Sequence, residues 1–248
     1  MGAKHLKVIR GGPTLHAPDA ATPRPRGVSC SSSGSSPRRS LYFTARRVNL
    51  AVRPVEETIT EMNARLFSFI GGKTGPWRVV DINTVAGEAL AEVERLDVVS
   101  GTVSEAPDGA KWLLRGLTSN ERYVVRLELD QLVARQPSLG RREATCAALI
   151  PIRKTASWWS LAQDERRRIF EESSHHVKTG LKYLPAIARR LHHCRDVGEN
   201  EPFDFLTWFE YASPDSAAFD ELVAELRVTE EWAYVDREID IRVVRDGA

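Results

Sequence analysis

The sequence has few cysteines and no long apolar run. Its three cysteines, Cys30, Cys146 and Cys194, lie far apart and form no CxxC pair. This spacing excludes a disulfide framework and favours a reducing compartment, so we expect a cytoplasmic protein. No apolar run reaches the roughly 18–20 residues that a membrane-spanning helix needs. The N-terminal segment also lacks the continuous apolar stretch of a secretory signal. We therefore expect no membrane association.

A strong net charge is also absent, since the formal charge is +1 at pH 7. This value gives no reason to expect a nucleic acid as partner. The near balance hides two unlike regions, because residues 1–61 carry a net charge of +6 and residues 62–248 a net charge of −5. The two regions therefore read as different kinds of chain.

Residues 1–61 are rich in Ser, Pro and Arg and poor in apolar residues, as in PRPRG and SCSSSGSSPRRS. This composition is typical of disorder, and we interpret the segment as a basic extension. A targeting or nucleic-acid-binding arm is the alternative. Strand-like sequence begins after Met62, which suggests the hypothesis that Met62 is the true start of the protein.

The hydrophobic patterns predict two halves, 62–140 and 141–248. In the first half we expect strands at 65–70, 77–83, 112–117 and 122–129 and a helix near 130–136. In the second half we expect strands at 146–153, 186–194, 203–211 and 232–244. Two helices should join them, at 160–184 with Ser160 as N-cap and at 213–229 with Ser213 as N-cap and Pro214 at the first helical position.

The predicted order in the second half is β-α-β-β-α-β, the ferredoxin-like unit. We therefore predict an α+β fold of the dimeric α+β barrel type. The ferredoxin-like unit should be complete in 141–248 and reduced in 62–140. The stretch GGKTG at 71–75 is similar to the end of a phosphate-binding loop, but position 67 is Phe where that motif needs Gly, and a strand follows instead of a helix.

Four of the six histidines lie in SSHHVKTGLKYLPAIARRLHHC, residues 173–194. In a helix, residues three and four apart share a face. His175 then lies with two lysines and should face water, whereas His176 lies with Gly180 and Tyr183 on a less polar face. Gly in a helix costs about 1 kcal/mol relative to Ala, and room for a bulky ligand would justify that cost.

Beyond Pro185 the chain should continue as a strand, in which successive side chains alternate between faces. Arg189 then shares an apolar face with Leu191 and His193, where a charge needs a partner. A zinc site is the obvious alternative, but adjacent histidines do not converge on one ion and no HxxxH spacing is present. Structural or surface roles for all four histidines remain open at this point.

Four stretches carry a resemblance to a known family: ALIPIRKTASWW, DERRRIFEESSHHVKTGLKYLPAIARRLHHCRD, PFDFLTWFEY and LRVTEEWAYVDREIDIR. Together they resemble the chlorite dismutase family of haem enzymes, most of all its short-chain, dimeric lineage. The resemblance extends over roughly residues 64–245 and is densest in the second half. It does not extend to residues 1–61, which depart from the short-chain pattern.

The resemblance implies one haem b per subunit, with His176 as the proximal ligand of the iron. It places Arg189 on the distal side. Glu231 matches the carboxylate that accepts a hydrogen bond from the proximal imidazole, with Glu230 as the alternative if the register slips by one. His175, His192, His193 and Cys194 are then left with structural or surface roles.

Three further positions follow from the same resemblance. Lys154 and Trp158 match residues beside a haem propionate, and Gln136 matches a residue that holds the distal arginine in one orientation. Trp159 matches a second tryptophan nearby, for which we favour a packing role. The aromatic pair could also both belong to the core.

The implied activity is that of a chlorite O2-lyase, which converts chlorite to chloride and dioxygen, in a homodimer. In that reaction Arg189 would keep the oxyanion fragment near the iron. The alternatives are a coprohaem decarboxylase or peroxidase-like member of the superfamily and a haem-binding or haem-carrying protein. The decarboxylating relatives lack the distal arginine, so Arg189 argues against the first of these.

Overall fold

The computed structural model describes residues 64–101, 103–118 and 121–246. These residues fall within one compact unit of the chain, Ala51–Ala248. The expectations about residues 1–61 and about Met62 lie outside the described residues. The predicted division at residue 140 stays a prediction.

The described chain alternates strands with short helical segments. The strands are β1 (Leu66–Gly72), β2 (Trp77–Ala86), β3 (Arg95–Ser100), β4 (Trp112–Leu117), β5 (Cys146–Lys154), β6 (Ala188–His193), β7 (Phe205–Tyr211) and β8 (Val235–Arg245). The α-helices are α2 (Arg126–Arg135), α3 (Ala156–Ser160), α4 (Gln163–Arg167), α5 (His176–Lys182) and α6 (Ser216–Arg227). A π-helical segment η1 (Arg168–Ser173) and the 3-10 segments η2 (Ser213–Asp215) and η3 (Glu230–Tyr234) join them.

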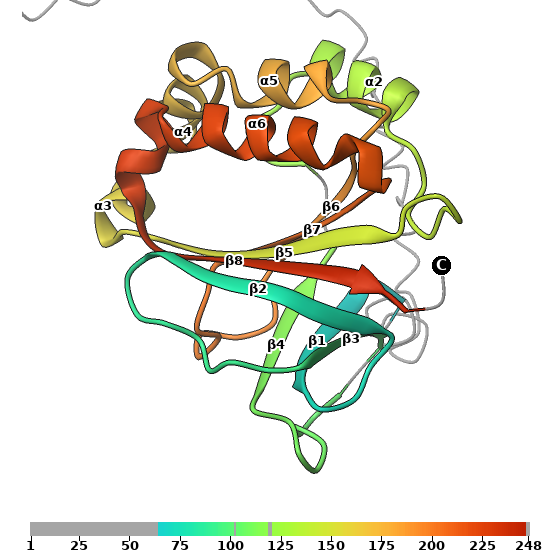
Figure 1. Ribbon diagram of the computed structural model, residues 1–248. Helices are drawn as coiled ribbons and strands as arrows, with labels where there is room; N and C mark the ends of the chain where they lie inside the picture. Colours follow the sequence, from blue (N-terminus) through green and yellow to red (C-terminus); the bar gives the residue numbers. More distant parts are fainter. Residues whose placement is uncertain (1–63, 102, 119–120, 247–248) are drawn as a thin grey trace, which may run out of the picture. The chain divides into compact units, whose positions relative to one another are not determined.

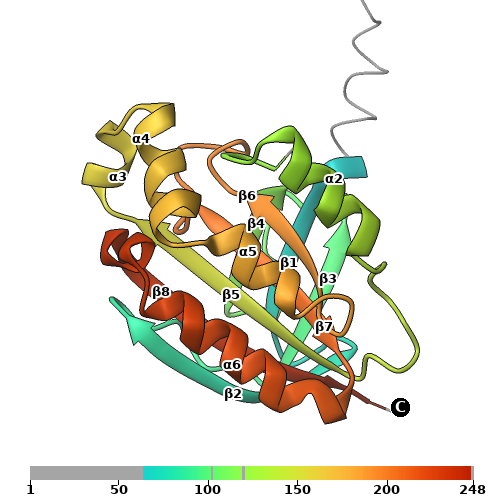
Figure 2. The ribbon, with the colours of Figure 1, turned by 90° about the horizontal axis from the view of Figure 1, so that it is seen from above.

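The strands form a closed antiparallel barrel in the order β1-β3-β2-β8-β5-β7-β6-β4. From β5 to β8 the elements follow the order β-α-β-β-α-β. Helices α2, α4, α5 and α6 lie over the outer face of the β5–β8 part, and β1 to β4 lie on its other side (Figures 1 and 2). This arrangement confirms the predicted α+β class.

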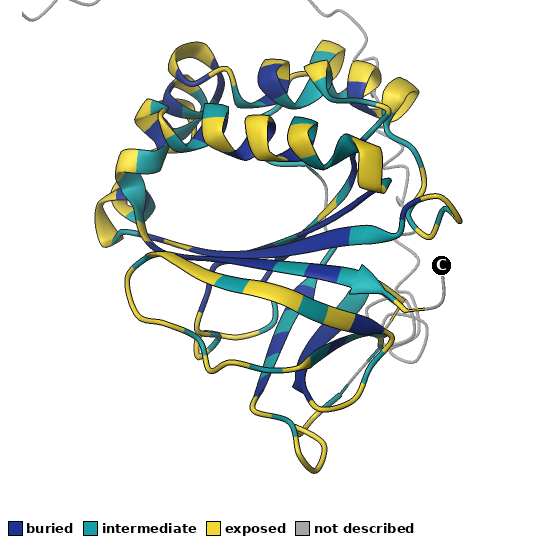
Figure 3. Cartoon of the chain, viewed as in Figure 1, coloured by how far each residue is buried: buried dark blue, intermediate teal, exposed yellow. Residues whose placement is uncertain are grey.

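Two apolar clusters use the two faces of the sheet β8-β5-β7-β6. The barrel cluster fills the barrel interior and includes Leu149, Leu206 and Ile241, each 0% exposed. The helix–sheet cluster lies between the outer face and the helices and includes Ile150 and Phe219. Figure 3 shows the buried strands beneath helices whose outward turns are exposed. The period-2 alternation of the strands divides their side chains between the two clusters.

The expected strand at 122–129 is wrong, because most of it belongs to helix α2 and the turn before it. The Glu128 carboxylate accepts a hydrogen bond from the Val125 N–H (3.0 Å) and forms an ion pair with Arg167. These contacts satisfy the first turn of a helix, whereas Val125 and Leu127 are exposed and supply no strand face. Strand β3 was not among the elements we expected.

The expected single helix at 160–184 is broken into four segments. Ser160 ends α3 instead of capping a helix, and the Thr155 side chain caps α3. The π-helical η1 and the left-handed backbone of His175 (φ 52°) interrupt the remaining path. The break matters for the site, because it gives α5 its own beginning directly before His176.

The second expected helix is also modified at its start. Residues 213–215 form a 3-10 turn whose N-cap is Ala212, so Ser213 is not the cap and Pro214 is not the first helical residue. The last strand begins at Val235, since 232–234 belong to η3. The expected strand after GGKTG is confirmed as β2. Among the described residues, no helix is both long and apolar enough to cross a membrane.

Candidate functional site

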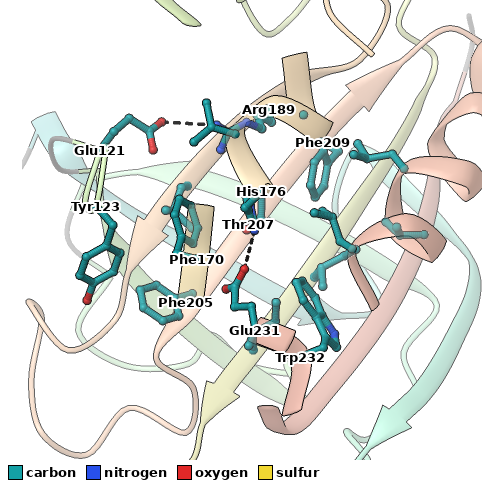
Figure 4. Close-up of a pocket in the computed structure, with 18 of the residues that line it drawn as sticks. Glu121, Tyr123, Phe170, His176, Arg189, Phe205, Thr207, Phe209, Glu231 and Trp232 are labelled. Carbon is teal, nitrogen blue, oxygen red and sulfur yellow. Dashed lines mark hydrogen bonds and ion pairs between the residues drawn. The ribbon is translucent and has the colours of Figure 1, made fainter. Parts of the chain in front are cut away.

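A large pocket lies between the outer face of the sheet and the helices, with about 1200 Å³ of empty space including its opening to solvent. Its walls are mainly aromatic and aliphatic, and Figure 4 shows the side chains that project into it. The polar lining residues are Glu121, Arg122, Tyr123, Lys154, His176, Tyr183, Arg189, His193, Thr207, Glu231 and Glu238. Five of the six predicted site residues, His176, Arg189, Glu231, Lys154 and Trp158, therefore line one pocket.

A hydrogen-bonded chain of three polar side chains lies on the helix side of the pocket. The His176 Nδ1 lies 2.7 Å from the Glu231 Oε2, and the Lys154 Nζ donates to the Glu231 Oε1 at 2.8 Å. Because a carboxylate only accepts, the His176 Nδ1 carries the proton, and in the neutral imidazole the Nε2 then keeps a free lone pair. Glu230 is exposed, so the geometry selects Glu231 of the two alternatives.

Glu231 is held as a carboxylate in the buried wall. Burial by itself raises the pKa of this group, but the positive charge of Lys154 and the contact with His176 lower the pKa to about 2. The Glu231 N–H also donates to the Ser174 hydroxyl at 2.9 Å, which fixes the backbone of η3 beside α5. The imidazole of His176 therefore faces a permanent negative charge.

The local fold positions His176 at the first turn of α5. His175 has a left-handed backbone, a conformation that costs free energy in a non-Gly residue and is concentrated at functional sites. The buried Glu171 carboxylate accepts hydrogen bonds from the Val177 N–H (2.6 Å) and the Lys178 N–H (3.3 Å). The Phe170 ring stacks on the His176 imidazole with centroids 4.4 Å apart. The interrupted helix thus supplies both the turn and the contacts that orient the ring.

Gly180 and Tyr183 line the pocket with His176, as the helical spacing predicts. A methyl group added at Gly180 would meet nothing within 4 Å, so this glycine leaves open space. His175 is exposed, which confirms the expectation that it faces water.

Strand β6 brings Arg189 to another wall of the pocket. Arg189, Leu191 and His193 line the pocket, whereas His192 is in contact with the barrel aromatics Phe67 and Phe69, as the predicted alternation requires. The Arg189 side chain is 16% exposed, and its guanidinium lies 3.8 Å from the Glu121 carboxylate.

Gln136 does not hold the Arg189 side chain in this structure. Its amide Nε2 donates to the main-chain carbonyl of Arg189 at 2.9 Å. Gln136 therefore fixes the strand from which the guanidinium projects, and the predicted side-chain contact is replaced by a backbone one.

The two tryptophans have different surroundings. Trp158 is 1% exposed, and its indole N–H has no hydrogen-bond partner within the described part of the chain. The Lys154 ammonium lies 4.8 Å from its ring centroid. Trp159 donates to the Asp204 carboxylate (3.1 Å) and lies under Arg195, which agrees with a packing role. Lys154 itself is bonded to Glu231, a partner that the resemblance did not imply.

The last three residues of the histidine segment, His192, His193 and Cys194, are buried. His192 and His193 are 1% and 2% exposed, and burial lowers the pKa of each to about 4. Cys194 is a buried free thiol whose pKa is raised by burial. The interpretation of these three as structural residues fits their burial, although His193 also lines the pocket.

Sequence reasoning missed Glu121, Tyr123, Phe170 and Trp232 as lining residues. Glu121 and Tyr123 lie between β4 and α2, Tyr123 within the predicted strand at 122–129 and Glu121 directly before it. Phe170 lies in η1, whose π-helical geometry moves it off the face that a regular helix would give. A local sequence signal for these four is absent, because their positions depend on irregular backbone.

The geometry can be compared with known proteins. The family model described as chlorite dismutase matches residues 108–246, which is more than half of the chain. The chain belongs to the chlorite dismutase family. The resemblance seen in the sequence is thereby confirmed, and the match includes all six predicted site residues.

Two individual relatives support the assignment. A crystal structure of the dimeric chlorite dismutase from Nitrobacter winogradskyi is 52% identical, with a TM-score of 0.67, and the match covers 72% of this chain and 99% of that chain. The chlorite dismutase of Ideonella dechloratans is 32% identical over 88 residues, 36% of this chain. The chain spans only 28% of that curated relative's length.

More distant structures share the fold alone. The chlorite dismutase of Candidatus Nitrospira defluvii in complex with imidazole is 18% identical with a TM-score of 0.52, covering 76% of this chain and 94% of that chain. Its likeness supports the α+β architecture of the family.

Proposed function

We propose that this member of the chlorite dismutase family is a haem-dependent chlorite O2-lyase, which converts chlorite to chloride and dioxygen. The observation that carries the proposal is that His176 and Arg189 line two walls of one pocket while Glu231 binds the Nδ1 of His176 (Figure 4). The imidazole nitrogen of His176 and the positive charge of Arg189 therefore lie beside the same space. The reaction balances without protons, since one chlorite gives one chloride and one dioxygen.

The pocket fits one haem b per subunit. Its walls are mostly apolar with a few polar groups, which is the usual composition of a cofactor site. Gly180 leaves room beside His176, and the unpartnered N–H of Trp158 could donate to a propionate. His176 would hold the iron through Nε2, and Arg189 lines another wall of the same pocket. When bound, the haem supplies the redox chemistry, as cofactors of this kind do.

The protein's own residues then have distinct tasks. Glu231 keeps the proton on the Nδ1 of His176, which fixes the tautomer and makes Nε2 a stronger donor to a metal. Lys154 keeps Glu231 ionised. The Arg189 guanidinium presents a planar set of donors, which suits binding and retention of a small oxyanion. Gln136 fixes the backbone of Arg189.

The proposal also includes a ferredoxin-like unit in the second half, a homodimer and a cytoplasmic location. The element order and the sheet order β8-β5-β7-β6 support a ferredoxin-like unit in the second half. The dimeric relative from Nitrobacter winogradskyi supports a homodimer. A cytoplasmic location is proposed from the scattered, free cysteines.

Oxygen release from chlorite by the haem-loaded protein tests the proposal. We expect His176→Ala to lose haem on gel filtration, whereas His175→Asn, an exposed neighbour that tolerates the left-handed backbone, retains it. Arg189→Ala should keep haem but release oxygen about 10- to 100-fold more slowly, the loss expected for a charged hydrogen bond. Arg190→Ala is the matched control and should remain active, because Arg190 lies on the other face of β6.

Two outcomes would contradict the proposal. Normal haem binding without oxygen release would favour a haem-binding role instead. If the Arg189→Ala protein released oxygen at an unchanged rate and lost its activity no faster during turnover, Arg189 would have no role in the mechanism.

A further inference from the structure

Glu121 lies in the loop between β4 and α2, and its side chain projects into the pocket beside Arg189 (Figure 4). The Glu121 Oε1 is 3.8 Å from the Arg189 Nη2, with the two side chains 33% and 16% exposed. Among the described residues, Glu121 is the ion-pair partner of Arg189. The site therefore contains a negative charge next to the cation assigned to the substrate.

The neighbours of Glu121 hold the loop in place. Arg122 pairs with Asp196 at 2.6 Å and so does not neutralise Glu121. The Tyr123 ring packs edge-on against Trp158, with centroids 6.0 Å apart, and against Phe170 at 5.9 Å. The Tyr123 carbonyl accepts a hydrogen bond from Arg167. Glu121 is thus followed by two residues, Arg122 and Tyr123, that are anchored by contacts with the described chain.

The contact between Glu121 and Arg189 is an ion pair without a hydrogen bond. A distance of 3.8 Å exceeds the 2.7–3.2 Å range of N–H···O bonds. The Arg189 guanidinium also donates no hydrogen bond to any residue that the structure describes. Its donors therefore remain available to an incoming anion, while its charge is already partly balanced.

We infer that Glu121 is an internal competitor of the substrate anion, a residue that sets how tightly Arg189 binds anions. This inference rests on the proposed function, because it takes Arg189 as the anion site. An anion that reaches Arg189 must share the guanidinium with the Glu121 carboxylate, which repels it. Glu121 therefore weakens the binding of every anion, and it speeds the release of the product chloride.

Titration of the ferric, haem-loaded protein with two probes tests the inference. Nitrite serves as the anionic probe and imidazole as the neutral one, both followed by the haem absorbance. We expect Glu121→Gln to bind nitrite about two- to fivefold more tightly, the range that partly exposed ion pairs give. Imidazole affinity should not change. Glu121→Asp should stay near the unmodified protein. Glu143→Gln removes the same charge from an exposed carboxylate outside the pocket and should have no effect.

The kinetics of chlorite turnover provide a second test of the role of Glu121. With chlorite, Glu121→Gln should lower KM and increase inhibition by added chloride, because both anions gain affinity. A purely structural role would instead lower kcat or shift both probes alike. Unchanged nitrite affinity, or an equal change for nitrite and imidazole, would overturn the inference.

A measurement without haem separates this inference from the proposed function. In the haem-free chain, the thermal unfolding midpoint is measured for the unmodified protein, Glu121→Gln, Arg189→Gln and the double variant. These four values form a double-mutant cycle. We expect the unfolding midpoint of the double variant to be no lower than that of Arg189→Gln alone. If the midpoint shifts of the two single variants were additive in the double variant, the two residues would not interact. If nitrite binding follows the prediction but chlorite yields no oxygen, the proposed function fails and the role of Glu121 stands.

Discussion

The two faces of the sheet β8-β5-β7-β6 are built from the same strands but have different contents. Toward the barrel, Leu149, Leu206 and Ile241 are fully buried in a continuous apolar core. Toward the helices, the strands contribute Arg189 and Thr207 to a pocket with about 1200 Å³ of empty space, part of it open to solvent. Around these three residues the barrel face is packed by apolar side chains, whereas the other face leaves space for a ligand.

This difference shows how one set of strands can separate stability from function. Close packing makes the barrel face intolerant of lost volume. The pocket face combines the apolar helix–sheet cluster with polar contacts, such as the Lys154–Glu231 pair and the ion pairs of Arg227 on α6 with Glu238 and Asp240 of β8. We therefore expect the pocket face to be sensitive to loss of a charge and the barrel face to loss of a methyl group.

The largest effect is expected for Lys154→Met on the pocket face. The Lys154 ammonium and the Glu231 carboxylate are 3% and 6% exposed, so the variant leaves a buried negative charge with His176 as its remaining partner. Breaking one side of a buried pair costs about 3–5 kcal/mol. Urea unfolding of the haem-free protein measures this loss of stability.

The adjacent residue on β5 is the matched control for that change. Arg153 pairs with Asp236 at 2.9 Å, but both side chains are about half exposed in their pair, at 44% and 40%. Arg153→Met should therefore cost less than about 1 kcal/mol. Equal losses for the two variants would show that burial does not decide the contribution of these pairs.

A neighbouring pair on β7 compares the two faces directly. Leu206 is 0% exposed in the barrel core, and Thr207 is half-buried in the pocket wall. Leu206→Ala should lower the free energy of unfolding by about 2–5 kcal/mol, whereas Thr207→Ala should change it by about 0.5 kcal/mol or less. Chemical denaturation of the haem-free chain measures both, and similar losses would mean that the pocket is packed like the barrel.

The sequence predicted this division of faces where the local structure is regular. Alternation along β6 placed Arg189 and His193 toward the pocket correctly, and helical spacing chose His176 over His175. The path around His176 could not be predicted, since η1 and the left-handed His175 break the 3.6-residue period. The contact between Glu121 and Arg189 also could not be predicted, because it connects a loop residue with a strand residue 68 positions further along the chain.

The smallest expected effect concerns two adjacent histidines that point to opposite faces, His192 toward the barrel and His193 toward the pocket. Burial lowers the pKa of each from 6.5 to about 4, with the charge of Arg190 adding to the effect at His192 and that of Arg122 at His193. The unfolded chain therefore binds these protons at a higher pH than the folded chain. Stability from this source is complete above about pH 6.5 and falls toward pH 4, by about 1.4 kcal/mol per pH unit for each histidine.

Urea unfolding from about pH 7 to about pH 5, a range above the titration of most carboxylates, isolates this term. His192→Gln and His193→Gln should each reduce the slope of stability against pH, and His175→Asn, at an exposed position, is the control. The reduction should be larger for His192, because its ring packs against the aromatic rings of Phe67 and Phe69, whereas water in the pocket beside Arg189 can solvate a charged His193. A larger effect of His193→Gln would mean that the pocket side of β6 is the drier one, and that the space beside Arg189 is closed to water before any ligand enters.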